Sequence, residues 1–261
     1  MRCGDITGFV APVRGDTVGT ARTHFMEEGR PMSEMPNEGE TVLARLRAAA
    51  EPHAARALGV ADLGALAARR PDALAMVPDG YTRAVVAGVR LSAAAVETVE
   101  DRPTPLYFHH YRQANYQLDR LAFALADELQ EAGYRALAIP ASQIVARDPM
   151  RGHVSHRLLG RFAGLGHIGR SGLLVHPRYG ARMRYVSVLT DAPLPAAVPF
   201  EGDCGDCRAC LTPCPASAIG ERIEDFDLDA CYRKLTEFTR IPFVGQHICG
   251  VCVKTCAGNG A

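Results

Sequence analysis

The middle of the chain alternates between segments with helical spacing and short apolar runs. One apolar set recurs at intervals of three and four residues, which places its side chains on one face of an α-helix. The set is Leu118, Leu121, Ala122, Leu125 and Leu129. Gly133 follows at the place where a glycine commonly ends a helix. The apolar runs at 81–91 and 134–139 predict buried strands, and Pro140 stops the second of them.

The residues on either side of this middle part also predict a mixture of helices and strands. Residues 40–70 are rich in alanine and leucine and predict helices broken at Pro52 and Gly59. Residues 155–163 predict a further helix, which is followed by two short strands, GLLVHP and RYVSVLT. We therefore expect an α+β fold whose main domain spans residues 39–198.

Composition marks two boundaries in the chain. Residues 1–38 mix glycine, proline, methionine and charged residues without a sustained period, which predicts a flexible leader and makes Met35 an alternative translation start. Three prolines between 193 and 199 form a joint ahead of the cysteine-rich part. Residues 199–261 therefore make a second, smaller domain.

Charge and hydropathy narrow the class of protein. The 29 basic and 29 acidic residues balance, whereas nucleic-acid-binding proteins normally carry a basic excess. No apolar run approaches the roughly 20 residues that cross a bilayer, and the first thirty residues lack the apolar core of a signal peptide. We therefore expect a cytoplasmic protein with no membrane association.

Positive charge is concentrated in one stretch. Residues 147–184 hold eight arginines and four histidines but a single acid, Asp148. Such a stretch suits an anionic group, and it equally suits a solvated, arginine-rich surface. His153, His156 and His167 have two corresponding interpretations, as metal ligands or anion contacts and as surface or capping residues.

The cysteines carry the strongest signal. Eight of the nine lie between Cys204 and Cys256, and Cys3 stands apart. Disulfides are rare in a reducing cytosol, so such a cluster indicates metal binding or catalysis. The first four, with Pro215 behind them, spell C-x2-C-x2-C-x3-C-P, the run that bacterial ferredoxins use. Two residues between thiolates let one tight loop direct three sulfurs at one cubane, while the fourth cysteine ligates another cluster.

A second cluster requires a second set of cysteines, and the sequence supplies it. The crossover assigns one cluster to Cys204, Cys207, Cys210 and Cys256, and the other to Cys214, Cys231, Cys249 and Cys252. Zinc is the alternative, because C-x2-C pairs also bind zinc. Three evenly spaced cysteines followed by C-P favour two 4Fe-4S clusters. Two such clusters form a short path for low-potential electrons, and this path implies an acceptor in the main domain, in a partner protein, or in both.

Two further segments carry weaker signals. Gly164, Gly166 and Gly169 make a formal G-x-G-x-x-G, but the preceding text predicts a helix and the following text a strand, the reverse of a dinucleotide site. These glycines instead favour close backbone approach to something bound or packed there. Residues 109–117 gather histidines, tyrosines, an arginine and amide side chains just ahead of the strong helix, enough donors to line a pocket.

The stretch FAGLGHIGRSGLLVHPRYGARMRYVSVLTDAPL, followed by the eight-cysteine pattern, resembles epoxyqueuosine reductase, which performs the last step of queuosine synthesis in tRNA, and more distantly the reductive dehalogenases. The likeness covers roughly residues 80–258. It implies a cobalamin-binding main domain with a nitroreductase-like fold, joined to a two-cluster ferredoxin domain that reduces the cobalt. Cobalamin or another ligand would then lie close to Gly164, Gly166, His167, Gly169 and Arg170.

The chain departs from that family at three places. Asn115, followed by Tyr116, stands at the catalytic position where the family has a proton-donating aspartate ahead of a tyrosine, and an amide cannot donate a proton as an acid does. His167 replaces a tryptophan of the family's glycine loop. The chain ends five residues after Cys256, without the helical-repeat region that helps to hold tRNA, which argues against queuosine-modified tRNA as the substrate.

Three hypotheses follow. We expect an iron–sulfur oxidoreductase that passes electrons through two clusters to a site in the main domain and receives them from a donor such as a ferredoxin or flavodoxin. The rival is a non-catalytic electron carrier or reductive activator, which docks on a partner enzyme and has no cobalamin of its own. The third is true epoxyqueuosine reduction with partner subunits that bind tRNA. Asn115 favours the rival, whereas the basic stretch and the polar segment favour an enzyme.

Overall fold

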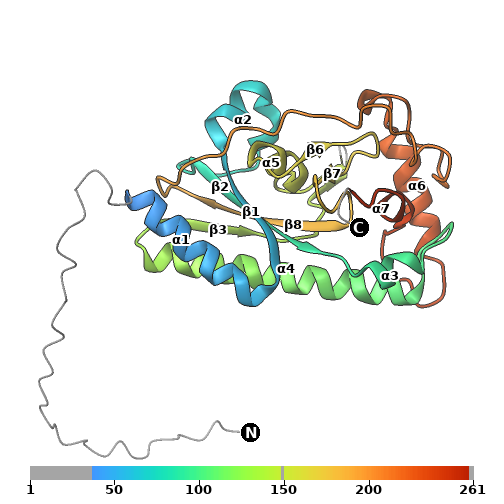
Figure 1. Ribbon diagram of the computed structural model, residues 1–261, viewed down its shortest axis with the longest axis horizontal. Helices are drawn as coiled ribbons and strands as arrows, with labels where there is room; N and C mark the ends of the chain where they lie inside the picture. The colour runs from blue at the N-terminus through green and yellow to red at the C-terminus, as the bar shows by residue number, and fades with distance from the viewer. Residues whose placement is uncertain (1–36, 148–149, 259–261) are drawn as a thin grey trace, which may run out of the picture. The chain divides into compact units, whose positions relative to one another are not determined.

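Four strands form one antiparallel sheet at the centre of the structure (Figure 1). The computed structural model describes residues 37–147 and 150–258, and these form one compact unit. The strands, in spatial order, are β1 (Ala55–Asp62), β2 (Arg83–Arg90), β8 (Met183–Thr190) and β3 (Ala136–Ile139). Each pairs antiparallel with its neighbour. The strands expected at 81–91 and 134–139 and in RYVSVLT are confirmed, as is a mixed fold of helices and sheet.

Strand β2 is covered on both of its faces. Successive side chains of a strand point to opposite sides of the sheet, so Val85, Ala87 and Val89 join one hydrophobic core while Ala84 and Val86 join the other. This double burial explains why the segment is a continuous apolar run in the sequence and not an alternation of apolar and polar residues.

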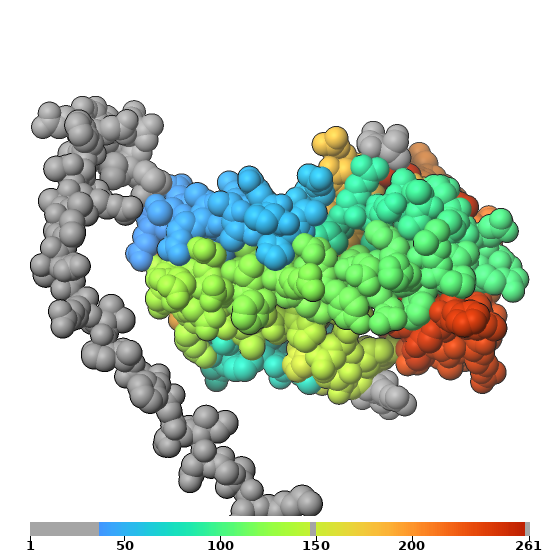
Figure 2. Space-filling model, turned by 90° about the horizontal axis from the view of Figure 1, so that it is seen from below, coloured from blue at the N-terminus to red at the C-terminus, as the bar shows by residue number. Residues whose placement is uncertain are grey.

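Two helices cover one face of the sheet and pack against each other (Figures 1 and 2). They are α1 (Glu38–Ala50) and α4 (Pro105–Glu131). Asn37 and Glu40 cap the start of α1 reciprocally, each side chain accepting a hydrogen bond from the other's backbone N–H. Gly133, with a φ of 88°, follows the end of α4. The helix predicted from the leucine spacing is confirmed together with its glycine end.

The opposite face is covered by α2 (Leu63–Arg69) and α5 (His156–Phe162), which contribute to the second hydrophobic core. The helix expected at 155–163 is confirmed. The shorter elements are α3 (Ala93–Glu97), β4 (Ala146–Arg147), β5 (Met150–Arg151), β6 (His167–Ile168) and β7 (Leu174–Val175), with 3-10 turns at Glu51–His53, Pro71–Leu74 and Ile223–Asp225. Strand β7 is the strand expected in GLLVHP.

The prediction of helices throughout 40–70 is wrong for residues 55–62, which form β1. Alanine and leucine favour a helix locally, but pairing with β2 satisfies the backbone of this segment in a ladder and overrides the local preference. Gly59 does not break a helix. It permits close packing, because a Cβ there would lie 2.2 Å from the carbonyl oxygen of Ala163. The break at Pro52 is confirmed, since α1 ends at Ala50.

The polar segment 109–117 lies within α4 and not ahead of it, because this helix already begins at Pro105. Thr104 caps the helix and Pro105 occupies its first position, where a missing N–H costs nothing. Leucine spacing is absent from this half, whose Tyr107 packs against the cysteine-rich part and whose Asn115 contacts Arg184 on β8. The buried ring of Tyr107 lies so close to Gly250 that a Cβ there would be 2.6 Å from the ring.

The cysteine-rich part adds α6 (Leu228–Phe238) and α7 (Val251–Thr255). Val244, Ile248 and Val251 belong to the same hydrophobic core as α4. The boundary expected near residue 198 stays a prediction, as does the ferredoxin-like arrangement of the cysteine-rich part. The leader assigned to 1–38, with Met35 and Cys3, lies almost wholly outside the described residues. Among the helices of the described part, none is long and apolar enough to cross a bilayer.

Candidate functional site

Turns and two short helices present the eight clustered cysteines. The segment from Cys204 to Cys214 runs through consecutive turns, in which the backbone N–H of Cys207 donates to the carbonyl of Cys204 at 3.0 Å. The other cysteines are Cys231 on α6, Cys249 just before α7, Cys252 on α7 and Cys256 at its C-terminal cap. All eight are free thiols. Their sulfurs are therefore available to a metal.

Thiols of the first predicted quartet act on one another electrostatically. Burial raises the pKa of Cys256, and the neighbouring thiols Cys204 and Cys207 raise it further. Burial likewise raises the pKa of Cys210, with further increases from Cys204, Cys256 and Cys207. Cys256, which is distant in sequence from the other three, thus lies in the same neighbourhood as Cys204, Cys207 and Cys210.

In the second predicted quartet, too, neighbouring thiols raise the pKa of individual cysteines. The pKa of Cys249 is raised to about 11, chiefly by burial, and the neighbouring thiols Cys231 and Cys214 contribute to the increase. Burial also raises the pKa of Cys252, followed by contributions from Cys249, Cys231, Cys214 and finally Cys210. Cys210 belongs to the first quartet, so the two sets adjoin. Thiolates and not thiols bind iron, and a metal ion overcomes a raised pKa by displacing the proton. Cysteine sulfurs are the donors that iron–sulfur clusters use, although within the described residues no group of three or more His, Cys, Asp or Glu side chains is placed to hold a metal ion. The number of clusters and the assignment of their ligands stay predictions.

The glycine loop expected at a cofactor lies against the first cysteines and the β7 region. Its predicted site residues are Gly164, Gly166, His167, Gly169 and Arg170. The Nε2 atom of His167 lies 3.7 Å from the Sγ of Cys204, and a Cβ on Gly169 would lie 3.2 Å from the same sulfur. Gly166 lies against the carbonyl of Val175, where a Cβ would be 2.1 Å from the oxygen. Close approach, predicted for these glycines, is what the packing requires.

Arg170 ties the same loop to the cysteine turns. Its guanidinium donates hydrogen bonds of 2.8 Å to the carbonyls of both Gly205 and Cys207. Gly164 packs against Val198, where a Cβ would lie 3.2 Å from the carbonyl oxygen. None of the five predicted loop residues lines the larger cavity of the described chain.

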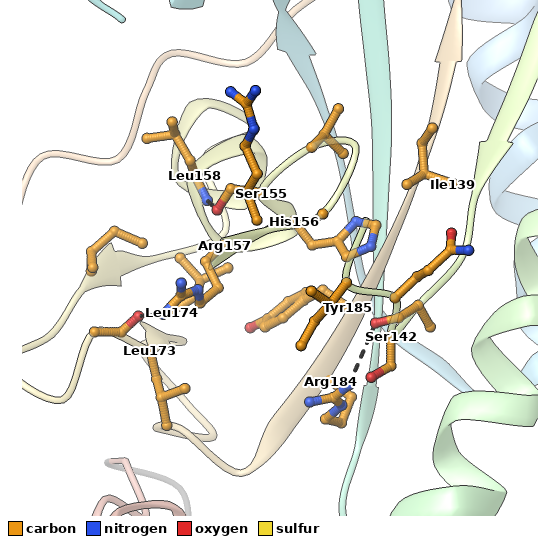
Figure 3. A pocket seen from close by; sticks show the side chains of 18 of the residues that line it. Ile139, Ser142, Ser155, His156, Arg157, Leu158, Leu173, Leu174, Arg184 and Tyr185 are labelled. Carbon is orange, nitrogen blue, oxygen red and sulfur yellow. Dashed lines mark hydrogen bonds between the residues drawn. The ribbon is translucent and has the colours of Figure 1, made fainter. Parts of the chain in front are cut away.

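That cavity, of about 790 Å³, lies between α5, β7, β8 and the cysteine-rich part (Figure 3). Apolar and aromatic side chains make up much of its wall, among them Tyr107, Tyr111, Ile139, Leu174, Met183 and Tyr185. Phe226, Leu228 and Val253 close it on the side of the cysteines. A ligand in this cavity would therefore touch both halves of the molecule.

Arg184 on β8 lies in the cavity wall and is held from α4. Its Nε and Nη2 atoms donate to the Oδ1 of Asn115 at 3.2 and 2.9 Å. The guanidinium also lies over the ring of Tyr111, with 4.3 Å between Cζ and the ring centroid. Asn115 is 7% exposed and sits in the middle of α4. The predicted catalytic amide is thus an acceptor for a cation at the cavity.

Arg157 on α5 lines the same cavity, and its Nη1 donates to the carbonyl of Gly172. Arg157 keeps exposed surface, while the surrounding protein lowers the pKa of its guanidinium. Arg184 lowers this pKa further, whereas the thiol of Cys231 raises it. Arg157 is therefore close enough to both Arg184 and Cys231 to feel their charge.

His156 lies in the cavity wall opposite Arg184 (Figure 3). Its Nδ1 contacts the Oγ of Ser187 at 2.9 Å and its Nε2 contacts the carbonyl of Pro140 at 3.0 Å. A carbonyl only accepts, so Nε2 carries the proton and Nδ1 accepts from the serine. Burial lowers the pKa of His156 to about 4. This histidine is a neutral structural residue.

Tyr116 lines a smaller pocket of about 160 Å³ together with Arg112, Asn115, Asp119, Ser142 and Gln246. Its hydroxyl accepts a hydrogen bond of 3.1 Å from Arg112. The rest of the polar segment divides among other contacts. His110 accepts from the backbone of Ser92 at 2.8 Å, and Tyr111 faces the larger cavity.

Sequence reasoning did not identify Arg157 and Arg184 as cavity residues. The signal was the basic stretch 147–184, for which a bound anion and a solvated surface were left as alternatives. Most of its arginines have other roles, such as Arg182, which pairs with Glu97 at 2.8 Å. Arg151 of the same stretch also lines the cavity, and only the three-dimensional arrangement shows which arginines of the stretch do so.

Sequence comparison finds relatives over part of the chain. The chain is 31% identical to epoxyqueuosine reductase from Aliivibrio fischeri over 112 residues, which are 43% of this chain and 27% of that protein. It is 35% identical to epoxyqueuosine reductase from Escherichia coli over 118 residues, 41% of this chain and 30% of that protein. The matches thus span less than a third of the length of these curated relatives. No family model matches the chain.

Structural comparison shows the fold. A catabolic reductive dehalogenase, solved in complex with 3-bromo-4-hydroxybenzoic acid, superposes with a TM-score of 0.65 at 20% identity and covers 81% of this chain and 31% of its own. At this identity the likeness concerns the fold.

Proposed function

Since the chain is an epoxyqueuosine reductase-like protein, we propose that it is an iron–sulfur oxidoreductase. It carries two 4Fe-4S clusters and passes low-potential electrons to an acceptor in the cavity between α5, β8 and the cysteine-rich part. The observation that carries this proposal is the set of eight free thiols in two interacting groups beside that cavity.

The exposure of the cysteines indicates the direction in which electrons pass between the two clusters. Cys207 of the first quartet is exposed, so this cluster lies nearest to the solvent and to an electron donor such as a ferredoxin or flavodoxin. Cys210 and Cys252 join the two quartets. The second quartet includes Cys231 beside Arg157, a residue of the cavity wall. Electrons would enter at the first cluster and leave from the second.

The charge around the second quartet supports an anionic cluster there. A cubane with four thiolates carries net negative charge, and a guanidinium nearby stabilises it. Arg157 supplies that cation. Reduction adds a further electron to the cluster, so Arg157 favours the reduced form of the cluster next to the cavity.

The cavity is the place for a corrinoid cofactor. When bound, a corrinoid supplies a cobalt centre that accepts electrons singly. The wall offers apolar and aromatic contacts from Tyr107, Tyr111 and Tyr185, and the cysteine-rich part lies within contact of the same space. The loop of Gly164, Gly166, His167, Gly169 and Arg170 would act on the first cluster, because His167 and Arg170 contact the cysteine turns.

Anaerobic purification followed by metal analysis tests the proposal. We expect about eight iron and about eight acid-labile sulfide per chain. About four of each contradicts the two-cluster assignment, and zinc in place of iron contradicts the redox function itself. Incubation with hydroxocobalamin followed by gel filtration tests the cavity, where we expect about one corrinoid retained per chain and a shifted visible spectrum.

A second function, a non-catalytic electron carrier without cobalamin, is favoured by Asn115. Its amide cannot donate a proton as an acid does, and its Oδ1 is already occupied by Arg184. A protein with full iron content that retains no corrinoid supports the carrier. Epoxyqueuosine reduction with tRNA held by partner subunits is tested by complementation, and a deficient strain that stays without queuosine contradicts it.

A further inference from the structure

The outer face of helix α4 has no covering element in the described part of the chain. Figure 2 shows this helix running along the surface beside α1. Its exposed positions recur every three or four residues from Arg112 to Glu131, which places them on one side of the helix. Two of them carry aromatic rings, Tyr116 at 50% exposed and Phe123 at 75%. The middle of this long helix therefore presents aromatic surface to water.

The charged side chains of this face are separated by sign. Arg112 and Arg120 lie before Phe123, whereas Asp127 and Glu131 lie after it. None of these four charges takes part in an ion pair with another residue of 37–147 or 150–258. The face thus has a basic half and an acidic half with an aromatic ring between them.

The remaining carboxylates of α4 have partners within the chain. Asp119 accepts from the backbone N–H of Ala141 at 2.9 Å, and Glu128 pairs with Arg45 of α1 at 2.8 Å. The order of the unpaired charges is unfavourable for a single helix, because the C-terminal end of a helix carries partial negative charge. The last turn of α4 contains Glu131 and no basic residue.

A second copy of the same helix, packed antiparallel, compensates this order. A twofold axis across the helix close to Phe123 places the basic half of each copy over the acidic half of the other. Arg120 then lies opposite Asp127 of the partner subunit, and the same pair recurs on the other side of the axis. Phe123 meets Phe123 of the partner subunit at the centre, and the dipoles of the two helices run in opposite directions.

We propose that the exposed face of α4 is a self-complementary interface through which two copies of the chain form an antiparallel dimer. The face from Arg112 to Glu131 is about 30 Å long and about 10 Å wide, so it buries less than the roughly 1,600 Å² of a standard interface. The dimer is therefore weak, with a dissociation constant on the order of 10 µM. Neither Arg120, Phe123 nor Asp127 lines the larger cavity, so the interface is separate from the proposed acceptor site.

Sedimentation equilibrium of the whole chain, purified without oxygen, tests the dimer over a range of protein concentrations. We expect the mean mass to rise from that of one chain towards that of two. High salt should weaken the association, because it screens exposed charge pairs. A chain that stays monomeric at every concentration overturns the proposal and leaves the face to a different partner. Growth beyond two copies also overturns it, because a twofold contact closes at a dimer.

Reversal of the charges at Arg120 and Asp127 tests the antiparallel register. Asp127→Arg alone and Arg120→Asp alone each place like charges opposite one another twice per dimer, and each should weaken association about tenfold. The double variant restores opposite charges with their sides exchanged and should recover the affinity to within about threefold. Arg233→Asp, at an exposed position of α6, is the control and should leave the affinity unchanged. A double variant that dissociates as readily as the single variants overturns the proposal.

Two variants separate association from folding. Phe123→Ala removes the central contact and should weaken association about tenfold. Asp127→Arg should leave the midpoint of thermal unfolding in dilute solution no lower, because arginine forms helices better than aspartate and suits the C-terminal half of a helix. Weaker association with an unchanged midpoint assigns the effect to the interface. A dimer that persists unchanged in both variants is formed by another surface, which overturns the proposal.

Discussion

The sheet body and the cysteine-rich part are stabilised in different ways. The largest fully buried side chains all lie between Leu46 and Leu194, in the sheet and its covering helices. Helix α6, by contrast, has no buried residue. Val244, Ile248 and Val251 anchor the cysteine-rich part to the body, but its turns enclose little apolar surface of their own. Apolar burial therefore stabilises the body, and under the proposed function metal ligation would stabilise the cysteine turns.

The largest effect is expected from removing one cysteine of the second predicted quartet. Cys252→Ser should reduce the iron content from about eight to about four per chain, because a cubane with three thiolates is easily lost. The far-ultraviolet circular dichroism of the sheet body should persist. Cys3→Ser is the control, since Cys3 belongs to neither quartet. Full iron content in Cys252→Ser, measured together with sulfide, contradicts the ligand assignment.

A substitution in the hydrophobic core tests whether apolar burial stabilises the sheet body. Leu125 is fully buried in α4, so Leu125→Ala should cost about 2–5 kcal/mol through lost burial and the cavity it leaves. The midpoint of thermal unfolding should fall, while iron content per folded chain stays constant. Phe123→Ala is the matched control on the same helix, because Phe123 is 75% exposed. Equal melting of the two variants would show that this core does not limit stability.

The same contrast explains how far the sequence predicted the molecule. Helix α4 and strand β2 were predictable, because a long apolar period and a continuous apolar run are local signals. Strand β1 was not, since alanine-rich text favours a helix until pairing with β2 is known. The start of α4 was missed because Tyr107 packs against the cysteine-rich part and not in a leucine stripe.

The residues of the candidate site likewise divide into those that sequence spacing predicted and those that only the fold brings together. The two cysteine quartets were predicted from spacing along the chain, and that grouping stays a prediction. Arg157 and Arg184 in the cavity wall come from α5 and β8, and the amide that positions Arg184 comes from α4. No spacing in the sequence encodes a contact among three separate elements. The basic stretch indicated an anion without telling which arginines would face it.

Acid should destabilise the body through His156. Burial lowers the pKa of this histidine to about 4, against about 6.5 in an unfolded chain. Between these pH values the unfolded chain binds a proton that the native state does not, so stability falls as the pH decreases. At pH 5.5 the loss relative to neutral pH is about 1.2 kcal/mol.

The check compares unfolding midpoints at pH 7 and pH 5.5. His156→Gln lowers the midpoint at both values, because hydrogen bonds to Ser187 and Pro140 are lost, but it should remove much of the difference between them. His109→Gln, at an exposed position of α4, should retain the full difference. A pH dependence that is the same in both variants assigns the acid sensitivity to another group.

The smallest effect concerns the contact between the two regions at His167. A cluster-bound thiolate only accepts hydrogen bonds, so the 3.7 Å contact with Cys204 requires the proton on Nε2. This donor stabilises the more negative, reduced cluster, and His167→Phe should therefore lower the potential of the first cluster. A hydrogen bond worth about 1 kcal/mol corresponds to roughly 40 mV in a one-electron couple. Redox titration followed by electron paramagnetic resonance measures this shift in potential.

His167→Gln keeps an N–H donor and should shift the potential less than His167→Phe does. If the two variants shift it equally, packing beside Cys204 and not hydrogen bonding sets the potential at this boundary between body and clusters.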